Sequence, residues 1–221
     1  MSQPKTILFL HGFASSARAT KGQFLERKLD DWPQVAFHAL DFNPTPRDFE
    51  YMTTTGLINR LRQYVLDHDL ARCSIVASSF GGLVALHYAH RFAGVEKLLF
   101  LAPALRWLSG GLSTTELAQW EKAGIAPLFH FAFDTRVPVR YALQADGLNF
   151  LEPVPPPAPM IIIHGNRDTT VPTGDSRAYA AKYHQKVQLI ELDADHDLNG
   201  HLPLIWHHVQ TFLLDANEGG N

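Results

Sequence analysis

The sequence predicts an α/β protein: a three-layer sandwich in which a mostly parallel, six-stranded sheet lies between two layers of helices. Six short apolar runs have the length of strands, at residues 5–10, 35–40, 73–77, 97–101, 160–163 and 187–192. Most of them are almost continuously apolar, which is typical of strands covered on both faces in a parallel sheet. Helical patterns of apolar residues lie between or after them, at residues 23–29, 53–66, 82–91, 172–183 and 202–214. This alternation favours βα units with right-handed crossovers.

Length and composition fit a single globular domain spanning residues 1–221. A chain of 221 residues with 46% hydrophobic residues is large enough to form a core without metal or disulfide support. The net charge of −3 and the lack of a basic stripe argue against a nucleic-acid partner. The single cysteine cannot form an internal disulfide, and no apolar run is long enough for a signal peptide or a membrane span. We therefore expect a cytoplasmic protein without membrane contact; the sequence is silent on oligomeric state.

The segment 106–159 interrupts the alternation. It contains no clear strand and ends in a proline-rich stretch at 153–159, which favours an extended connector over a helix. Aromatic residues are frequent in it: Trp107, Trp120, Phe129, Phe131, Phe133, Tyr141 and Phe150. We interpret the segment as a small cap or lid inserted over the sheet. The alternative is an ordinary helical hairpin with no role in binding.

Ser79 is the candidate nucleophile. The apolar run at 73–77 leads into a Ser-Ser-Phe-Gly-Gly turn and then into a helix. A sharp strand-to-helix turn needs tiny side chains two residues before and two residues after its central serine. Ala77 and Gly81 meet this requirement for Ser79, whereas Val76 and Phe80 would flank Ser78. The alternative is a plain turn whose serine only caps the helix.

A nucleophilic serine needs a base and a carboxylate that orients the base, on loops after later strands of the sheet. Asp168 follows the run at 160–163, and His196 follows the run at 187–192. The order serine, acid, histidine predicts a triad of Ser79, Asp168 and His196. Asp168 could alternatively only shape a turn, and His196 could be a surface residue or a metal ligand. His201 is the rival base and Asp175 the rival acid.

Acyl transfer also needs donors for the negative charge that develops on the carbonyl oxygen. One donor should be the backbone N–H of Phe80, the residue after the nucleophile. The other should come from the loop after the first strand, where Gly12 lets the chain turn and leaves the N–H of Phe13 available. The alternative is that His11 and Gly12 only end a strand.

These motifs resemble those of the α/β-hydrolase superfamily over nearly the whole chain. The matching segments are HGF at 11–13, the turn at Ser79, HGNRD at 164–168 and DH at 195–196. More narrowly, LHGFASS at 10–16 with Lys21, and the Ser-Ser-x-Gly-Gly turn at 78–82, resemble a group of small bacterial serine esterases. The resemblance implies hydrolysis of short acyl esters or thioesters without a cofactor. It also implies that the superfamily's usual first two strands are missing and that the strand order is 2-1-3-4-5-6.

The predicted substrate is therefore a small-molecule acyl ester or thioester, and we expect no cofactor and no metal. His196 would remove the proton of Ser79 during attack on the carbonyl, and would then protonate the leaving group. Perhydrolases, C–C hydrolases and lyases use the same three groups on other substrates, and they are the alternative enzyme class. A binding protein without catalytic activity on the same fold is a third possibility.

Overall fold

The computed structural model describes residues 5–215, and its centre is one six-stranded sheet. The strands are β1 (Lys5–Leu10), β2 (Val35–Leu40), β3 (Cys73–Ser78), β4 (Val95–Leu101), β7 (Met160–Gly165) and β8 (Val187–Leu192). They lie in the order β2-β1-β3-β4-β7-β8, and every neighbouring pair is parallel. Because β7 and β8 are the fifth and sixth strands of this sheet, the expected order 2-1-3-4-5-6 is confirmed.

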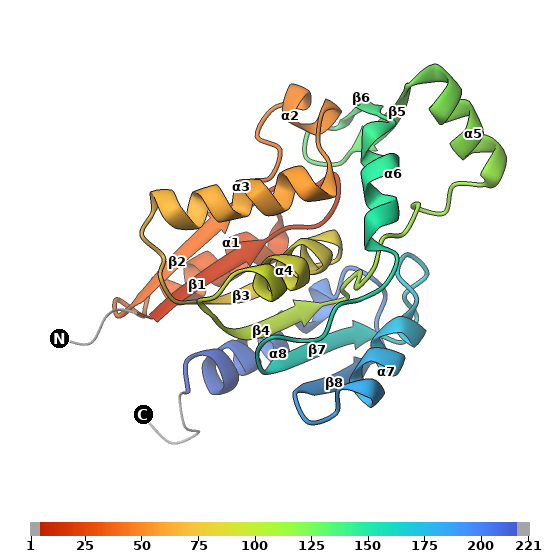
Figure 1. Cartoon of the computed structure of the whole chain (residues 1–221). Helices are drawn as coiled ribbons and strands as arrows, with labels where there is room; N and C mark the ends of the chain where they lie inside the picture. Colours follow the sequence, from red (N-terminus) through yellow and green to blue (C-terminus); the bar gives the residue numbers. More distant parts are fainter. Residues whose placement is uncertain (1–4, 216–221) are drawn as a thin grey trace.

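Helices cover both faces of the sheet (Figure 1). One layer contains α1 (Thr20–Leu29), α8 (Leu202–His208) and the π-helical turn η3 (Val209–Leu213), preceded by the short η2 (Asn199–His201). The other contains α3 (Thr54–Asp67), α4 (Phe80–Arg91) and α7 (Thr173–Lys182). Side chains of β1 alternate between the layers: Ile7 and Phe9 pack toward α1 and α8, and their neighbours Leu8 and Leu10 toward α3 and α4. This double burial explains why the strands are continuously apolar.

Capping residues set the start of several helices. Thr45 and Asp48 form a reciprocal capping box at α2 (Pro46–Glu50), whose first residue is a proline. The Thr53 side chain accepts a hydrogen bond from the N–H of Gly56 at the start of α3. These caps satisfy backbone donors that a helix cannot satisfy by itself.

The segment 106–159 lies beside the ends to which the arrows of the central strands point (Figure 1). It contains α5 (Thr114–Ala123), β5 (Ile125–His130), β6 (Thr135–Arg140), α6 (Ala142–Gly147) and η1 (Leu148–Phe150). The expectation that it has no strand is wrong, because β5 and β6 form an antiparallel hairpin in which Pro127 lies opposite Pro138. Proline normally argues against a strand because it lacks an N–H donor. In a two-stranded hairpin both strands are edges, so the missing donors are tolerated.

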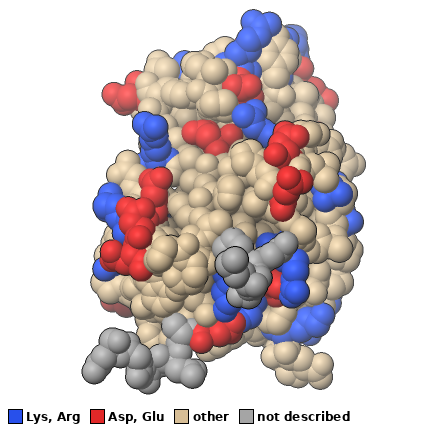
Figure 2. Space-filling model, turned by 90° about the vertical axis from the view of Figure 1, so that its left-hand side faces the viewer, with Lys and Arg blue, Asp and Glu red and all other residues tan. Residues whose placement is uncertain are grey.

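The surface carries charges of both signs. On the face shown in Figure 2, basic and acidic side chains are interspersed, with broad areas of other residues between them. Within residues 5–215, the helices are all too short or too polar to cross a membrane.

Candidate active site

Ser79 occupies the turn between β3 and α4 in a strained backbone conformation, with φ 52° and ψ −122°. Few residues other than glycine adopt a positive φ, and such strain is typical of functional sites. The surrounding backbone holds the residue in place: its N–H donates to the carbonyl of Leu101, and its carbonyl accepts from the N–H groups of Gly82 and Ala104. Its side chain makes no capping hydrogen bond to α4, so the alternative of a helix-capping serine is wrong.

Small residues around Ser79 allow this turn. A Cβ atom at Gly81 would lie 2.6 Å from the carbonyl oxygen of His11 and 2.7 Å from that of Leu10, which is too close for any side chain. Ala77, two residues before Ser79, is completely buried. On the other side, a Cβ at Gly12 would lie 3.2 Å from the Cβ of Ser79. The need for a tiny side chain two residues after Ser79, which helped to select this serine in the sequence, therefore reflects close backbone contacts at Gly81.

The structure brings Ser79, His196 and Asp168 into one hydrogen-bonded chain. Nε2 of His196 lies 3.0 Å from Oγ of Ser79, and Nδ1 of the same ring lies 2.7 Å from Oδ2 of Asp168. The carboxylate can only accept from Nδ1–H, so Nε2 is left to accept the serine proton. Ser79, Asp168 and His196 lie in the loops that follow β3, β7 and β8, and the carboxyl ends of these parallel strands meet at the same edge of the sheet.

Asp168 is held by donors on both oxygens. Its Oδ1 accepts from the N–H groups of Thr170 and Val171, each at 2.8 Å, and its side chain is completely buried. Burial raises the pKa of this carboxyl, but the hydrogen bonds from Val171 and His196 outweigh that effect and leave the pKa below its ordinary value. The carboxylate is therefore stabilised in its ionised form.

His164 is a member of this network that sequence reasoning did not assign a role. Its Nε2 lies 3.0 Å from Oδ2 of Asp168, the oxygen that also accepts from His196. Its Nδ1 lies 2.8 Å from Oγ of Ser176, and burial lowers the pKa of the ring. A neutral ring that accepts from Ser176 and donates to Asp168 satisfies all of these contacts. The HGNRD motif contained the residue, but only the fold shows that it faces the carboxylate.

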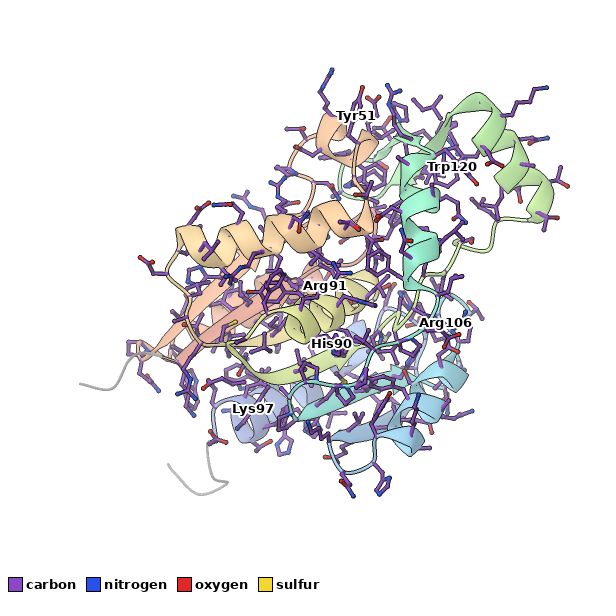
Figure 3. The ribbon with its side chains drawn as sticks, viewed as in Figure 1. Tyr51, His90, Arg91, Lys97, Arg106 and Trp120 are labelled. Carbon is purple, nitrogen blue, oxygen red and sulfur yellow. The ribbon has the colours of Figure 1, made fainter. Side chains whose placement is uncertain are left out.

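The rival residues lie elsewhere. Asp175 accepts a 2.9 Å hydrogen bond from Nε of Arg106, which Figure 3 shows near α7. His201 belongs to η2, and the imidazole in contact with Ser79 is that of His196. Within residues 5–215, no cluster of three or more His, Cys, Asp or Glu side chains is arranged to hold a metal ion.

The loop after β1 carries Gly12 and Phe13 next to Ser79. Nε2 of the buried His11 accepts from the N–H of Phe42, so Nδ1–H donates to the carbonyl of Gly12 at 2.7 Å. The C=O and N–H of one peptide point in opposite directions, so this bond turns the N–H of Phe13 away from the His11 ring. Phe80 is the first residue of α4, where an N–H has no partner within the helix. Both N–H groups suit the predicted role as donors.

A cavity of about 290 Å³ opens beside Ser79. Its walls combine Phe13 and Phe80 from the core of the fold with residues of the 106–159 segment, including Trp107 and Trp120. Trp120 lies where α5 meets the β5–β6 hairpin and α6 (Figure 3), and its Nε1 donates to the carbonyl of Val139. A larger depression of about 510 Å³ lies over α2 and the start of α3 and includes none of the three hydrogen-bonded residues.

Comparison of the sequence with models of protein families gives one match, which extends over residues 6–213. It is the model of the uncharacterised protein family UPF0227. The chain belongs to this family. No curated protein sequence matches this UPF0227 chain.

Solved structures place the UPF0227 chain in the α/β-hydrolase fold, as the sequence predicted. Alpha/beta hydrolase domain-containing protein 10 from mouse is 18% identical, with a TM-score of 0.77 over 96% of this chain and 90% of that one. Est1E from Butyrivibrio proteoclasticus with bound ferulic acid is 18% identical, with a TM-score of 0.73 over 96% and 89% of the two chains. The monoacylglycerol lipase of Paleococcus ferrophilus is 12% identical, with a TM-score of 0.73 over 98% and 96%.

Proposed function

We propose that this protein is a serine hydrolase that cleaves carboxylic ester or thioester bonds of small acyl substrates. The observation that carries the proposal is the continuous hydrogen-bonded chain from the hydroxyl of Ser79 through His196 to the buried carboxylate of Asp168. A serine hydroxyl is a weak nucleophile unless an oriented base takes its proton. Two structural neighbours, a monoacylglycerol lipase and Est1E with bound ferulic acid, support an acyl substrate.

The reaction follows from the roles of these groups. His196 takes the proton of Ser79 as the serine oxygen attacks the carbonyl carbon, and Asp168 stabilises the imidazolium that forms. The N–H groups of Phe13 and Phe80 hold the oxyanion. His196 then protonates the leaving alcohol or thiol, and an acyl-enzyme on Ser79 remains. Water activated by the same ring releases the acid.

We propose further that residues 106–159 act as a cap that completes the substrate pocket. This segment supplies Trp107, Trp120 and other apolar walls of the cavity beside Ser79. Burial of apolar surface against aromatic side chains provides much of the affinity for an acyl or alcohol group.

Labelling with a fluorophosphonate probe tests the nucleophile. We expect the native protein to be labelled, Ser79→Ala to lose labelling, and Ser78→Ala to keep most of it. Ser78 is the matched control because it is the adjacent hydroxyl, buried at the end of β3. Folded native protein that is not labelled would contradict the proposal. Loss of labelling in Ser78→Ala but not in Ser79→Ala would show that Ser79 is not the nucleophile.

A panel of p-nitrophenyl esters and acyl thioesters of graded length tests the substrate class. We expect Ser79→Ala to lower kcat by about 10⁴-fold or more on any substrate that is cleaved. Native protein that is labelled but cleaves no member of the panel would favour one of the other reactions that use the same three groups.

A further inference from the structure

Gln144 is a buried polar residue in the wall of the apolar cavity beside Ser79. It lies on α6, is only 4% exposed, and lines the same cavity as Ser79. Most of its neighbours in the wall are apolar, among them Leu112, Leu128 and Leu143. Ser109 and Thr170 also line the cavity, but both are more exposed than Gln144. A buried amide in such a wall needs an explanation, because buried polar groups are nearly always hydrogen-bonded.

The orientation of the amide is fixed by Trp107. Nε1 of this indole lies 3.0 Å from Oε1 of Gln144, and an indole N–H can only donate. The oxygen of the amide is therefore the atom that faces Trp107, and the NH₂ group faces away from it. The indole is itself confined, because a Cβ at Gly147, three residues further along α6, would lie 2.3 Å from its ring.

Among the described residues the NH₂ group of Gln144 has no acceptor, yet it is not one of the fully buried polar atoms that lack a partner, so it keeps some access to the cavity that Gln144 lines. When a molecule fills the cavity and removes this access to solvent, the donor stays satisfied only if that molecule supplies an acceptor. Sites that hydrogen-bond a substrate group reject analogues that lack it far more strongly than apolar sites reject a missing methylene. The arrangement thus fits a device for recognising an oxygen on the substrate.

We propose that Gln144 is a specificity-determining residue that selects esters whose acyl arm carries a hydrogen-bond acceptor, such as an ether, hydroxyl or carbonyl oxygen, away from the scissile carbonyl. The inference rests on the proposed function, since it assumes that Ser79 attacks the carbonyl at one end of the cavity. The acyl arm then extends along the apolar walls, and its oxygen accepts from the amide of Gln144. A cavity of about 290 Å³ limits this arm to a short chain or a single ring.

An oxygen scan tests the proposal. Straight-chain p-nitrophenyl esters of equal length are compared, in which one CH₂ at a time is replaced by an ether oxygen, so that the leaving group stays constant. We expect the native protein to prefer one oxygen position over the all-carbon ester in kcat/KM. In Gln144→Leu this ratio should fall by about five- to tenfold, as expected for the loss of one hydrogen bond. A flat profile in the native protein would overturn the proposal.

Two further variants separate the amide donor from other effects. Gln144→Glu, assayed at pH 8, keeps an oxygen for Trp107 but replaces the donors by an acceptor, and it should lose the preference as Gln144→Leu does. If Gln144→Glu retained the preference, the effect would come from anchoring Trp107 and the proposal would be wrong. Gln119→Leu alters an exposed glutamine of α5 and should leave the ratio unchanged.

Fluorophosphonate labelling distinguishes failure of the proposed role of Gln144 from failure of the proposed hydrolase function. Native protein that is labelled and cleaves the all-carbon ester, but shows no preferred oxygen position, would refute only the role of Gln144. Native protein that is not labelled would refute the proposed function itself.

Discussion

At the scale of single residues, the candidate site depends on how closely backbone atoms approach one another around Ser79. Ser79 has a positive φ, and its hydroxyl lies within hydrogen-bonding distance of His196. The turn can approach the end of β1 this closely because Gly81 has no side chain. The neighbouring Ala77 fills its space without leaving surface exposed. The two small positions are not equivalent, because Ala77 already carries a Cβ whereas a Cβ at Gly81 would collide with the backbone.

We expect Gly81→Ala to displace the turn, because its methyl group would collide with the backbone carbonyls of His11 and Leu10. The loss of unfolding free energy should be about 1–3 kcal/mol, with loss of fluorophosphonate labelling. Ala77→Gly is the matched variant at the other small position, and it should keep its labelling. Thermal unfolding and labelling of both variants measure this difference, and an unchanged Gly81→Ala would contradict the crowding argument.

His164 should act as a positioning residue for Asp168. His164→Leu keeps a similar volume but removes the donor to Oδ2 and the acceptor for Ser176. We expect kcat on a cleaved ester to fall about tenfold with little change in KM, because the carboxylate would orient His196 less firmly. Ser176→Ala removes only the outer hydrogen bond and should have a smaller effect on kcat. Normal kcat in a His164→Leu protein of lower stability would assign His164 a purely structural role.

At the scale of elements, the loops after β3, β7 and β8 must keep fixed positions relative to one another. A hydrogen bond from α1 helps to hold the loop after β8. Nζ of Lys21, on α1, donates to the carbonyl of Asp197 at 2.6 Å, directly after His196. Burial lowers the pKa of this lysine, while the nearby carboxylates of Asp195 and Asp197 act in the opposite direction. The ammonium group thus fixes the backbone that carries the imidazole.

We expect Lys21→Met to loosen this loop without unfolding the protein. Hydrogen exchange of residues 193–198 should become faster, and kcat should fall about three- to tenfold, because His196 would be held less firmly against Ser79. Lys28→Met, an exposed lysine on the same helix, is the control. Unchanged exchange in this loop would show that the contact contributes nothing to its order.

At the scale of the whole molecule, four histidines are buried among the described residues: His11, His87, His130 and His164. Burial is the main cause that lowers the pKa of His87, His130 and His164, and it lowers that of His87 to about 4. His87 packs against the ring of Phe150, and its Nε2 has no hydrogen-bond partner in the described part of the chain. Arg91 and His90, both on α4 (Figure 3), lower its pKa further. Protonation of His87, His130 and His164 therefore opposes folding.

The sign of the pH dependence follows from proton binding. Below the ordinary histidine pKa of 6.5 the unfolded chain takes up protons that the folded chain does not, so stability falls with falling pH until the folded pKa values are reached. We expect His87 to contribute about 2 kcal/mol of the loss between pH 7.5 and pH 5. Urea unfolding at both pH values measures this contribution. Between pH 7.5 and pH 5 the unfolding free energy of His87→Leu should decrease by about 2 kcal/mol less than that of the native protein, and His90→Leu is the control. An equal loss in native protein and His87→Leu would contradict the assignment.

The sequence by itself predicted the strands of the sheet and the three residues that the fold brings together. The strand order followed from the resemblance to the α/β-hydrolase superfamily. The strands and the proximity of the three residues could be predicted because they depend on local patterns: continuous apolar runs, the spacing of Ala77 and Gly81 around Ser79, and the position of Asp168 and His196 after strands of the same sheet. Carboxyl ends of parallel strands meet at one edge, so loops far apart in the sequence become neighbours. The catalytic roles themselves stay predictions.

Only the tertiary structure decided what fills the space around these residues. It revealed the β5–β6 hairpin in a segment that was expected to contain no strand. It showed that the carboxylate of Asp175 accepts a hydrogen bond from Arg106. It also showed His164 against Asp168 and Gln144 in the cavity wall. The physical reason is that a side-chain contact between distant segments depends on packing and rotamers across the whole core, which no local pattern of residues encodes.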